Sequence, residues 1–478
     1  MNPHRRSGTV SSTLLVTVCC LLGSTLPTAS HAQAGEGAAC GPGPSTSLTP
    51  VSWTQLGPGL RAGTATARTG TRTTPIHLLD DDVTAGGVLP HAYAAAVTAS
   101  ETVTDMAATS GAAAAVNGDF FHVTADGLHL VPDGVLNAGD GTAKGWTQSQ
   151  TALVLNPGEA HIGWVHMAGT ITFSTRVPPT SSTPAGQTSA RPTQSATAKK
   201  RAAAKRRASK AAANRRRAAA HHPAKHRPKR HLGVHRTLKK AKRPTSRVTV
   251  TKVTAAATVP VTASTWAVNL SGLNDDQTVG PTLFTSAWGP ADRTAGQPAS
   301  AREIDIRDGV VTRNTTTLDG GSSQGSALIV AGTDATSLAS VPVGASAAVT
   351  TALVSDATGA VVRDAIGGDL LLVQHSTVSD PGCNLEADAT LRPRASVGTT
   401  ADGAHAIVMV SDGDSPTVPG LSLRQTAEVM LHLGVEAALN FDAGNSAQLI
   451  ERSSGGLRQV NANHQNPART VPDGLVFA

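Results

Sequence analysis

Short runs of alternating apolar and polar residues, separated by glycine-containing turns, recur along much of the 478-residue chain. Ile76–Leu79 forms one short apolar run that predicts a strand. Further strands are expected wherever Asp-Gly or Thr-Gly divides two β-prone runs. These are Glu303–Ile306 with Val310–Arg313, Ala395–Thr399 with His405–Val410, and Val361-Val362 after Thr358-Gly359. The pattern predicts a β-rich fold.

Two segments have helical periodicity instead. Leu423–Leu433 places Leu423, Ala427, Met430 and Leu431 on one face, with Ser422 and Gln425 as a capping box and Gly434 as its stop. A second helix is expected near Thr102–Ser110, with Ser100 or Thr102 as its cap and Gly111 as its stop. The fold class is therefore α/β (α+β): a mixed, β-rich sheet with a few packed helices.

The sequences that follow the two helices are similar. Gly111–Asp119 can be laid on Gly434–Asp442, and in both segments Asn follows the glycine by six residues and Asp follows it by eight. Each copy has the pattern of a helix, a glycine stop, a buried strand and a polar loop, and α/β folds tend to bind ligands at such loops. Chance similarity in an Ala-rich chain is an equal alternative. If the repeat is real, the two loops could face one another across one site.

The chain's composition changes abruptly at residues 178–250. This segment is rich in Pro, Ser, Thr and Ala, and between Lys199 and Arg247 it holds 20 Lys and Arg and no acid. It has too little apolar surface to offset the entropy of ordering, so a disordered insertion within one domain is expected. It could bind an anionic polymer such as teichoic acid or nucleic acid, or serve as a solvated spacer. The rest of the chain, without the first 34 residues, has 18 basic and 33 acidic residues.

The N-terminus has the layout of a secretory signal peptide. Arg5 and Arg6 precede an apolar run, Leu14–Leu26, and small residues follow at possible cleavage positions. The alternative, a buried N-terminal helix, fits less well because Pro27 and small polar residues come next. We expect a cleaved signal at 1–34 and an N-terminal extension at 35–74. The mature protein is expected to be secreted or extracellular, either free or associated with the cell wall, and without a stable membrane anchor. Cys40 and Cys383 then remain, either as one disulfide or as two free thiols.

Five segments, in order, resemble those of the phosphodiester glycosidase family. They are Ala115–Phe121 (AVNGDFF), Ala365–Gly368 (AIGG), Arg392–Gly398 (RPRASVG), Leu439–Ser446 (LNFDAGNS) and Arg469–Phe477 (RTVPDGLVF). The resemblance implies a domain whose two parts, 75–177 and 251–478, flank the insertion. It also implies cleavage of a sugar from a phosphodiester-linked partner, with a glycan or a sugar-phosphate polymer as substrate.

Two carboxylates are the candidate catalytic groups. The resemblance gives Asp442 the family's aspartate position, as nucleophile or base, and Asp119 is a possible second carboxylate. A capping role in its loop is the alternative for each. Arg392 and Arg394, or the amides of the Gly444 loop, could bind the phosphate. The remaining candidate substrate contacts are Asn117, Gly118, Asn440, Asn445 and Ser446.

Asp119, Ala443 and Asn445 stand where the family often has glycine, which suggests an altered or inactive site. The rival functions are therefore a catalytically silent polymer-binding protein and a carrier for the basic segment. The sequence shows no nucleotide-binding glycine loop and no metal-ligand spacing, so no cofactor and no metal are expected. Asp80-Asp81-Asp82 is expected to be a solvated loop rather than a cation site.

Overall fold

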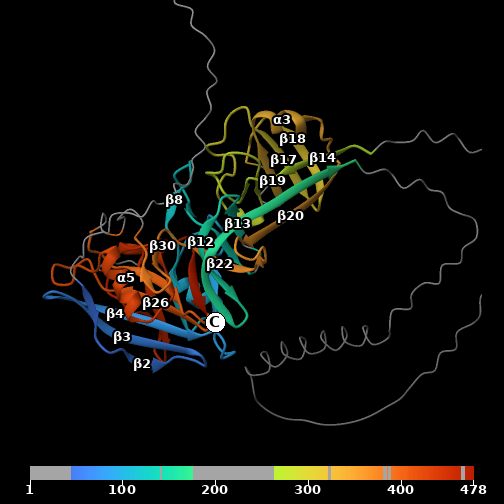
Figure 1. The fold of residues 1–478 in the computed structure, drawn as a ribbon. Helices are drawn as coiled ribbons and strands as arrows, with labels where there is room; N and C mark the ends of the chain where they lie inside the picture. The colour runs from blue at the N-terminus through green and yellow to red at the C-terminus, as the bar shows by residue number, and fades with distance from the viewer. Residues whose placement is uncertain are drawn as a thin grey trace, which may run out of the picture. The chain divides into compact units, whose positions relative to one another are not determined.

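The computed structural model describes residues 45–139, 141, 143–175, 263–320, 325–380, 385, 389–463 and 469–478. Three large sheets dominate these residues, together with a few short helices (Figure 1). The predicted β-rich α/β class is therefore confirmed. The two smallest sheets are the strand pairs β6 (Glu101–Thr102) with β30 (Thr470–Val471) and β8 (Phe121–Val123) with β9 (Leu130–Pro132).

The first large sheet has nine strands and is mostly antiparallel along the order β1-β3-β4-β26-β25-β27-β23-β24, with β2 paired to β3. Its strands are β1 (Thr46–Leu48), β2 (Ser52–Gln55), β3 (Leu60–Thr69), β4 (Arg72–Asp82), β23 (Leu371–Gln374), β24 (Thr377–Val378), β25 (Ala395–Thr399), β26 (His405–Ser411) and β27 (Ala437–Phe441). Helix α5 (Leu423–His432) packs on one face of this sheet (Figure 1).

The second sheet has thirteen strands, which come from both sides of the predicted insertion in the sequence. Its strands are β10 (Leu136–Ala138), β11 (Ala143–Trp146), β12 (Gln150–Asn156), β13 (Glu159–Ser174), β14 (Thr265–Asn269), β15 (Gly272–Leu273), β16 (Thr282–Phe284), β17 (Arg302–Arg307), β18 (Val310–Thr315), β19 (Ser326–Val330), β20 (Ser346–Ser355), β21 (Val361–Val362) and β22 (Asp364–Gly367). The long strand β13 pairs with β14 so that Ser174 lies opposite Thr265. The chain therefore returns to the same sheet directly after the predicted insertion, which itself lies outside the described residues.

The third sheet has five strands in the order β29-β28-β7-β31-β5. They are β5 (Pro90–Tyr93), β7 (Ala114–Asn117), β28 (Leu449–Ser453), β29 (Gly456–Gln459) and β31 (Gly474–Phe477). Helix α1 (Val103–Ser110) covers one face of it through Met106, which packs against Ala115 and Val476. The other short helical segments are η1 (Ser286–Trp288), α3 (Gly332–Ser337), η2 (Leu338–Ser340) and η4 (Gly444–Ser446).

The main core is shared by all three sheets. Val397 and Leu439 of the nine-stranded sheet pack in one cluster with Val116 and Leu475 of the five-stranded sheet and Ile366 of β22. Helices α5 and α1 lie on the opposite faces of their sheets, in separate apolar clusters. Since each helix meets a sheet on one side only, its apolar residues lie on that side.

The predicted turns and helix ends form as expected. Strands β17 and β18 pair around Asp308-Gly309, where both residues have positive φ, as the residue types at this turn favour. Strands β25 and β26 pair around Asp402-Gly403, and β21 pairs with β20. Helix α5 has the predicted capping box of Ser422 and Gln425.

The acidic run Asp80-Asp81-Asp82 was expected to be a solvated loop, and this prediction is wrong. All three residues belong to β4, between β3 and β26, where Asp81 is fully buried. Asp80 accepts hydrogen bonds from Arg61 and pairs with His405. Among the described residues, neither carboxylate oxygen of Asp81 has a hydrogen-bond partner. Burial, followed by the charges of Asp80 and Asp82, raises its pKa to about 7.

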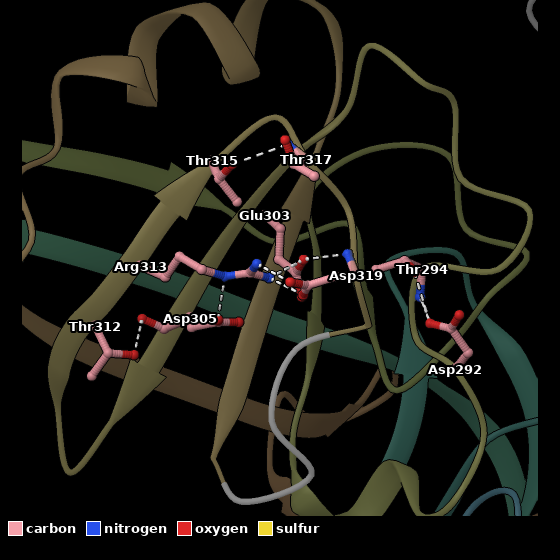
Figure 2. A network of polar contacts seen from close by, with 9 residues as sticks. All are labelled: Asp292, Thr294, Glu303, Asp305, Thr312, Arg313, Thr315, Thr317 and Asp319. Carbon is pink, nitrogen blue, oxygen red and sulfur yellow. Dashed lines mark hydrogen bonds and ion pairs between the residues drawn. The ribbon is translucent and has the colours of Figure 1, made fainter.

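A second polar network, partly buried, lies on the thirteen-stranded sheet (Figure 2). Arg313 of β18 pairs with Glu303 and Asp305 of β17 and with Asp319 in the loop that follows. Glu303 is fully buried, and burial raises its pKa. Paired and hydrogen-bonded carboxylates of this kind hold the loop against the sheet.

Several predictions fall on residues outside the described ranges. They concern the signal peptide at 1–34, the part of the 35–74 extension that precedes residue 45, both Cys40 and Cys383, and the basic segment. Within the part of the chain that the structure describes, no helix is long and apolar enough to cross a membrane.

Candidate active site

The repeated segments form two similar units. Helix α1 stops at Gly111 and leads into β7, and helix α5 is followed by Gly434 and β27; both glycines have left-handed φ values, 72° and 82°. Asn117 ends β7, and Asn440 is the next-to-last residue of β27. The two units come from different sheets that share one core.

The loops after these two strands are hydrogen-bonded to each other. Asn117 Nδ2 donates to the carbonyl of Asp442 at 2.8 Å, and the amide of Asp442 donates to the carbonyl of Gly118 at 2.9 Å. Gly118 has no room for a side chain, because a Cβ there would lie 2.6 Å from Asp473 Oδ1. The structure thus brings Asn117, Gly118 and Asp442 together, as the repeat suggested.

Asp119 follows directly and is buried, with 2% of its surface exposed. Its Oδ1 accepts from the amide of Phe120 at 2.7 Å and its Oδ2 from the amide of Gly134 at 2.5 Å. Burial raises its pKa to about 7, although these two amides act to lower it. A carboxyl group with this pKa can exchange a proton near neutral pH.

Asp473, next to β31, is a second buried carboxyl group that the sequence did not single out. Its Oδ1 accepts from the amide of Asp119 at 3.0 Å, while its Oδ2 is buried and has no partner among the described residues. Burial and then the charge of Asp119 raise its pKa well above the usual range. In the sequence, Pro472-Asp473-Gly474 is indistinguishable from an ordinary turn before a strand, so only the fold reveals this neighbour.

Asp119 lines a cavity of about 410 Å³. Two further carboxylates, Asp133 and Asp369, belong to its wall, together with Phe120, Gly134, Gln150, Thr151, Trp164 and Gly368. Glycine is required at position 134, because a Cβ there would meet Asp119 Oδ2 at 2.1 Å. The cavity is therefore acidic, and the backbone of Gly134 packs closely against the carboxylate of Asp119.

Asp442 is half-buried and lies beside this cavity rather than in its lining. Burial raises its pKa, whereas the Ser446 hydroxyl, the amide of Ala443 and the charge of Arg469 lower it. The charge of Asp133, which does line the cavity, acts on both Asp442 and Asp119. The carboxylates of the two loops therefore share one electrostatic environment.

Three cationic groups surround this acidic region. Lys144 is buried, pairs with Asp275 at 2.9 Å and lies 3.5 Å from the carbonyl of Gly134. His122 lies between Asp133 and Asp276, at 2.6 and 2.9 Å. Burial lowers the pKa of His122, but these two hydrogen bonds outweigh it and raise the pKa to about 9, so the ring is protonated at neutral pH.

Arg469 is the third cation, and it is exposed. Its guanidinium lies over the ring of Phe121, 4.9 Å from the centroid, and its charge lowers the pKa of Asp442. The sequence placed Arg469 in the closing segment of the family resemblance but gave it no role. Separation in the chain, 27 residues beyond Asp442, concealed that the two are neighbours.

The arginines predicted to bind phosphate lie elsewhere. Arg394 is 2% exposed, and its guanidinium donates to the carbonyls of Leu421 and Thr390. Arg392 is half-buried, and its backbone forms an isolated antiparallel β-bridge with Leu421. Among the described residues, neither arginine belongs to the lining of the cavity beside Asp119. The described contacts of Arg394 anchor the segments on either side of β25, because a buried guanidinium requires acceptors.

The Gly444 loop also differs from the expectation of an anion-binding nest. The amide of Gly444 donates to the carbonyl of Pro393, and that of Ser446 to the carbonyl of Ala443. Gly444 keeps a left-handed φ of 64°, whereas Ala443 is extended at −114°. Asn445 lies in the turn η4 and is not among the described non-glycine residues with positive φ. Replacement of glycine at 443 and 445 therefore introduces no backbone strain.

The two predicted sugar contacts on the strands are buried. Asn117 is fully buried and uses both ends of its amide, because its Oδ1 accepts from the amide of Gln448. Asn440 is 1% exposed, and its Oδ1 has no partner among the described residues. Asn117 therefore joins the two loops rather than facing the cavity. In the described part of the chain, no group of three or more His, Cys, Asp or Glu is arranged to hold a metal ion.

A family model of phosphodiester glycosidases matches residues 300–478, which include β25, β27, the Gly444 loop and β31. No curated protein matches the sequence.

Two solved structures share the fold at low identity, and a third is similar at a lower TM-score. A hypothetical protein from Synechocystis is 16% identical, with a TM-score of 0.55, over 90% of this chain and 64% of that one. The chain thus spans less than two thirds of the Synechocystis protein. A protein of Burkholderia pseudomallei K96243 that is named as a putative exported protein is also 16% identical, with a TM-score of 0.54. The match covers 86% of this chain and 75% of that one. The auto-inhibited catalytic domain of the zebrafish N-acetylglucosamine-1-phosphodiester alpha-N-acetylglucosaminidase is 12% identical, with a TM-score of 0.36, over 91% and 88%.

The residues matched by the family model include four of the five segments on which the sequence resemblance was based. Residues 300–478 therefore match the model of the phosphodiester glycosidase family, and the resemblance read from the sequence is confirmed.

Proposed function

We propose that this protein is an exported hydrolase that cleaves a sugar from a sugar phosphodiester at the cavity beside Asp119. The observation that carries the proposal is the direct hydrogen bonding of the Asn117–Asp119 and Asp442 loops at an acidic cavity. The phosphodiester glycosidase domain at residues 300–478 supports the reaction class.

Asp442 is proposed as the carboxylate that acts at the anomeric carbon. Cleavage of a glycosyl phosphate develops positive charge on the sugar ring, which a nearby carboxylate stabilises or attacks. Since a phosphate monoester is a good leaving group, one ionised carboxylate can suffice. Burial raises the pKa of Asp442, whereas the Ser446 hydroxyl, the amide of Ala443 and the charge of Arg469 oppose this rise and favour the ionised form.

Asp119 is proposed as the second carboxyl group. Its pKa of about 7 leaves a large protonated fraction at neutral pH, so it can donate a hydrogen bond or a proton in the cavity. Burial raises the pKa of both carboxyl groups, but Asp119 is the more deeply buried of the two, which favours Asp119 as the acid and Asp442 as the base.

The leaving phosphate needs a cation, and Arg469 is the proposed partner in place of Arg392 and Arg394. Arg469 is exposed, and its charge lowers the pKa of Asp442. Its guanidinium is oriented by stacking on Phe121. A guanidinium can bind two phosphate oxygens at once.

Export and a cell-surface glycan or sugar-phosphate polymer complete the proposal. The support is the signal-like N-terminus, together with the fold shared with a protein named as exported. The basic segment 199–247 would add electrostatic adhesion to an anionic polymer, a prediction based on its 20 cationic residues alone.

A double variant tests whether the altered glycine loop limits the site. We expect Ala443→Gly with Asn445→Gly to leave hydrolysis unchanged, because neither position needs a positive φ. The extra backbone freedom of glycine should lower the free energy of unfolding by about 0.5–1 kcal/mol per substitution. Denaturant unfolding and an activity assay of the same sample check this; a clear gain in turnover would contradict it.

The experiment that tests the proposal is hydrolysis of a UDP-linked sugar and of a sugar 1-(nitrophenyl phosphate) by the mature chain. Release of free sugar is expected from both, and its dependence on Asp442 is argued below. Absence of release from every sugar 1-phosphodiester tried would favour the catalytically silent, polymer-binding alternative.

A further inference from the structure

One exposed aromatic residue stands at the edge of the acidic cavity. Trp164 lies on β13, opposite Thr151 of β12, and 48% of its surface is exposed. Among the described residues, it is the only aromatic one of the exposed large hydrophobic side chains. Exposure of half an indole costs hydrophobic free energy, so a ligand that covers it gains affinity.

Trp164 forms part of two adjoining cavities. One is the cavity of about 410 Å³ that contains Asp119. The other, of about 230 Å³, also has in its lining Leu370, Leu371, Gln374, Ser379, Asp380 and Leu385. Thr151, Trp164 and Asp369 belong to the walls of both, so the two cavities meet at the indole.

The chemistry of the shared wall fits a neutral sugar. A sugar ring has an apolar C–H face that can stack on an indole, and hydroxyl groups that bind carboxylates, amides and hydroxyls. Asp369, Gln374 and Ser379 supply those polar groups. No Lys, Arg or His among the described residues lines either cavity, which disfavours a phosphate there.

We propose that Trp164 is the stacking platform for a second sugar unit, adjacent to the sugar that is cleaved. This inference rests on the proposed function, and it deepens it: the substrate is a phosphodiester of an oligosaccharide rather than of a single sugar. The first sugar occupies the cavity beside Asp119, the next one crosses Trp164 into the smaller cavity, and the phosphate points toward Arg469.

Calorimetric titration of the wild-type chain with neutral sugars tests the platform separately from catalysis. The probes are N-acetylglucosamine and glucose with their linear di- and trisaccharides, and uridine as an aromatic competitor. In at least one series, affinity should rise about tenfold or more from mono- to disaccharide. Trp164→Ala should abolish this gain, and Trp164→Phe should retain most of it.

Trp266→Phe is the matched control, because Trp266 lies on β14 and packs against a different core. It should leave all affinities unchanged. Equal affinity for mono- and disaccharide in every series, no binding of any sugar, or a length effect that survives Trp164→Ala would overturn the proposal. Tighter binding of uridine than of any disaccharide would also overturn it, because the platform would then be for a base.

The two proposals fail in different ways. If the sugars bind with the expected length dependence but no phosphodiester is hydrolysed, the platform stands and the catalytic proposal falls. If hydrolysis occurs with equal kcat/KM for mono- and oligosaccharide substrates in both wild type and Trp164→Ala, the platform falls and the catalytic proposal stands.

Discussion

Replacement of Asp442 by asparagine is expected to lower the turnover of a sugar 1-phosphodiester about a thousandfold or more, while substrate binding is largely retained. Asparagine keeps the shape of the side chain and removes the negative charge that the developing positive sugar ring requires. The amide of Asp442 would still donate to Gly118, because that bond uses the backbone. The loss should therefore appear in kcat and hardly in KM.

The matched control for this variant is Asp308→Asn. Asp308 is exposed at the turn between β17 and β18, away from the cavity, and has a φ of 50° that asparagine also accepts. The control makes the same chemical change and should hydrolyse at the wild-type rate. If Asp442→Asn also hydrolyses at that rate, Asp442 has no catalytic role.

Asp119→Asn separates the two carboxyl groups further. Because the pKa of Asp119 is about 7, its protonated fraction falls as pH rises from 6 to 8. If the protonated form is required, the kcat of the wild type should fall over this pH range. The variant should have a lower kcat that no longer depends on pH in this range. An unchanged pH profile in the variant would remove Asp119 from the proposed mechanism.

The second large effect concerns stability and arises at Asp81. A buried Asp whose folded-state pKa is about 7 favours its protonated form, whereas the unfolded chain titrates near 3.8. The free energy of unfolding therefore falls as pH rises from about 4 to 7, because the folded state holds the proton more tightly than the unfolded chain does. Above pH 7 this group lowers the free energy of unfolding no further. Between pH 5 and pH 8 this group alone should lower the free energy of unfolding by about 2.5 kcal/mol.

Asp81→Asn removes the titration. Denaturant unfolding of wild type and variant at pH 5 and pH 8 measures the difference between them at each pH. We expect that difference to move in favour of the variant by about 2.5 kcal/mol at pH 8. The control Asp308→Asn should show no such change, and an equal difference between wild type and Asp81→Asn at both pH values would contradict the assignment.

Much of the site's framework could be predicted because it is local. A capping box, a left-handed glycine and a buried apolar run determine each helix–strand unit, and the Gly–Asn–Asp spacing places the polar residues just after the strand. Both units formed as expected, and their loops meet. Asn117 was correctly placed at the contact, but its amide joins the loops instead of facing the cavity.

The charged groups could not be predicted in the same way. Whether Arg394 faces a ligand or lies under a loop depends on β25 being central in its sheet, which its own sequence does not show. Asp81 stands between two aspartates in the sequence, yet the pairing of β4 between β3 and β26 buries it. Asp473 reaches the site because the C-terminal strand β31 pairs with β7, and Arg469 directly precedes β30, which pairs with β6.

In the proposed reaction, water attacks the sugar and not the phosphorus. Hydrolysis of a sugar 1-phosphodiester in ¹⁸O-labelled water distinguishes the two, since the isotope shift in the ³¹P spectrum reports label on the released phosphate monoester. We expect cleavage of the bond between the anomeric carbon and oxygen, so the released phosphate carries no ¹⁸O. Incorporation of ¹⁸O into the phosphate would show cleavage at phosphorus and would rule out the proposed glycosidase reaction.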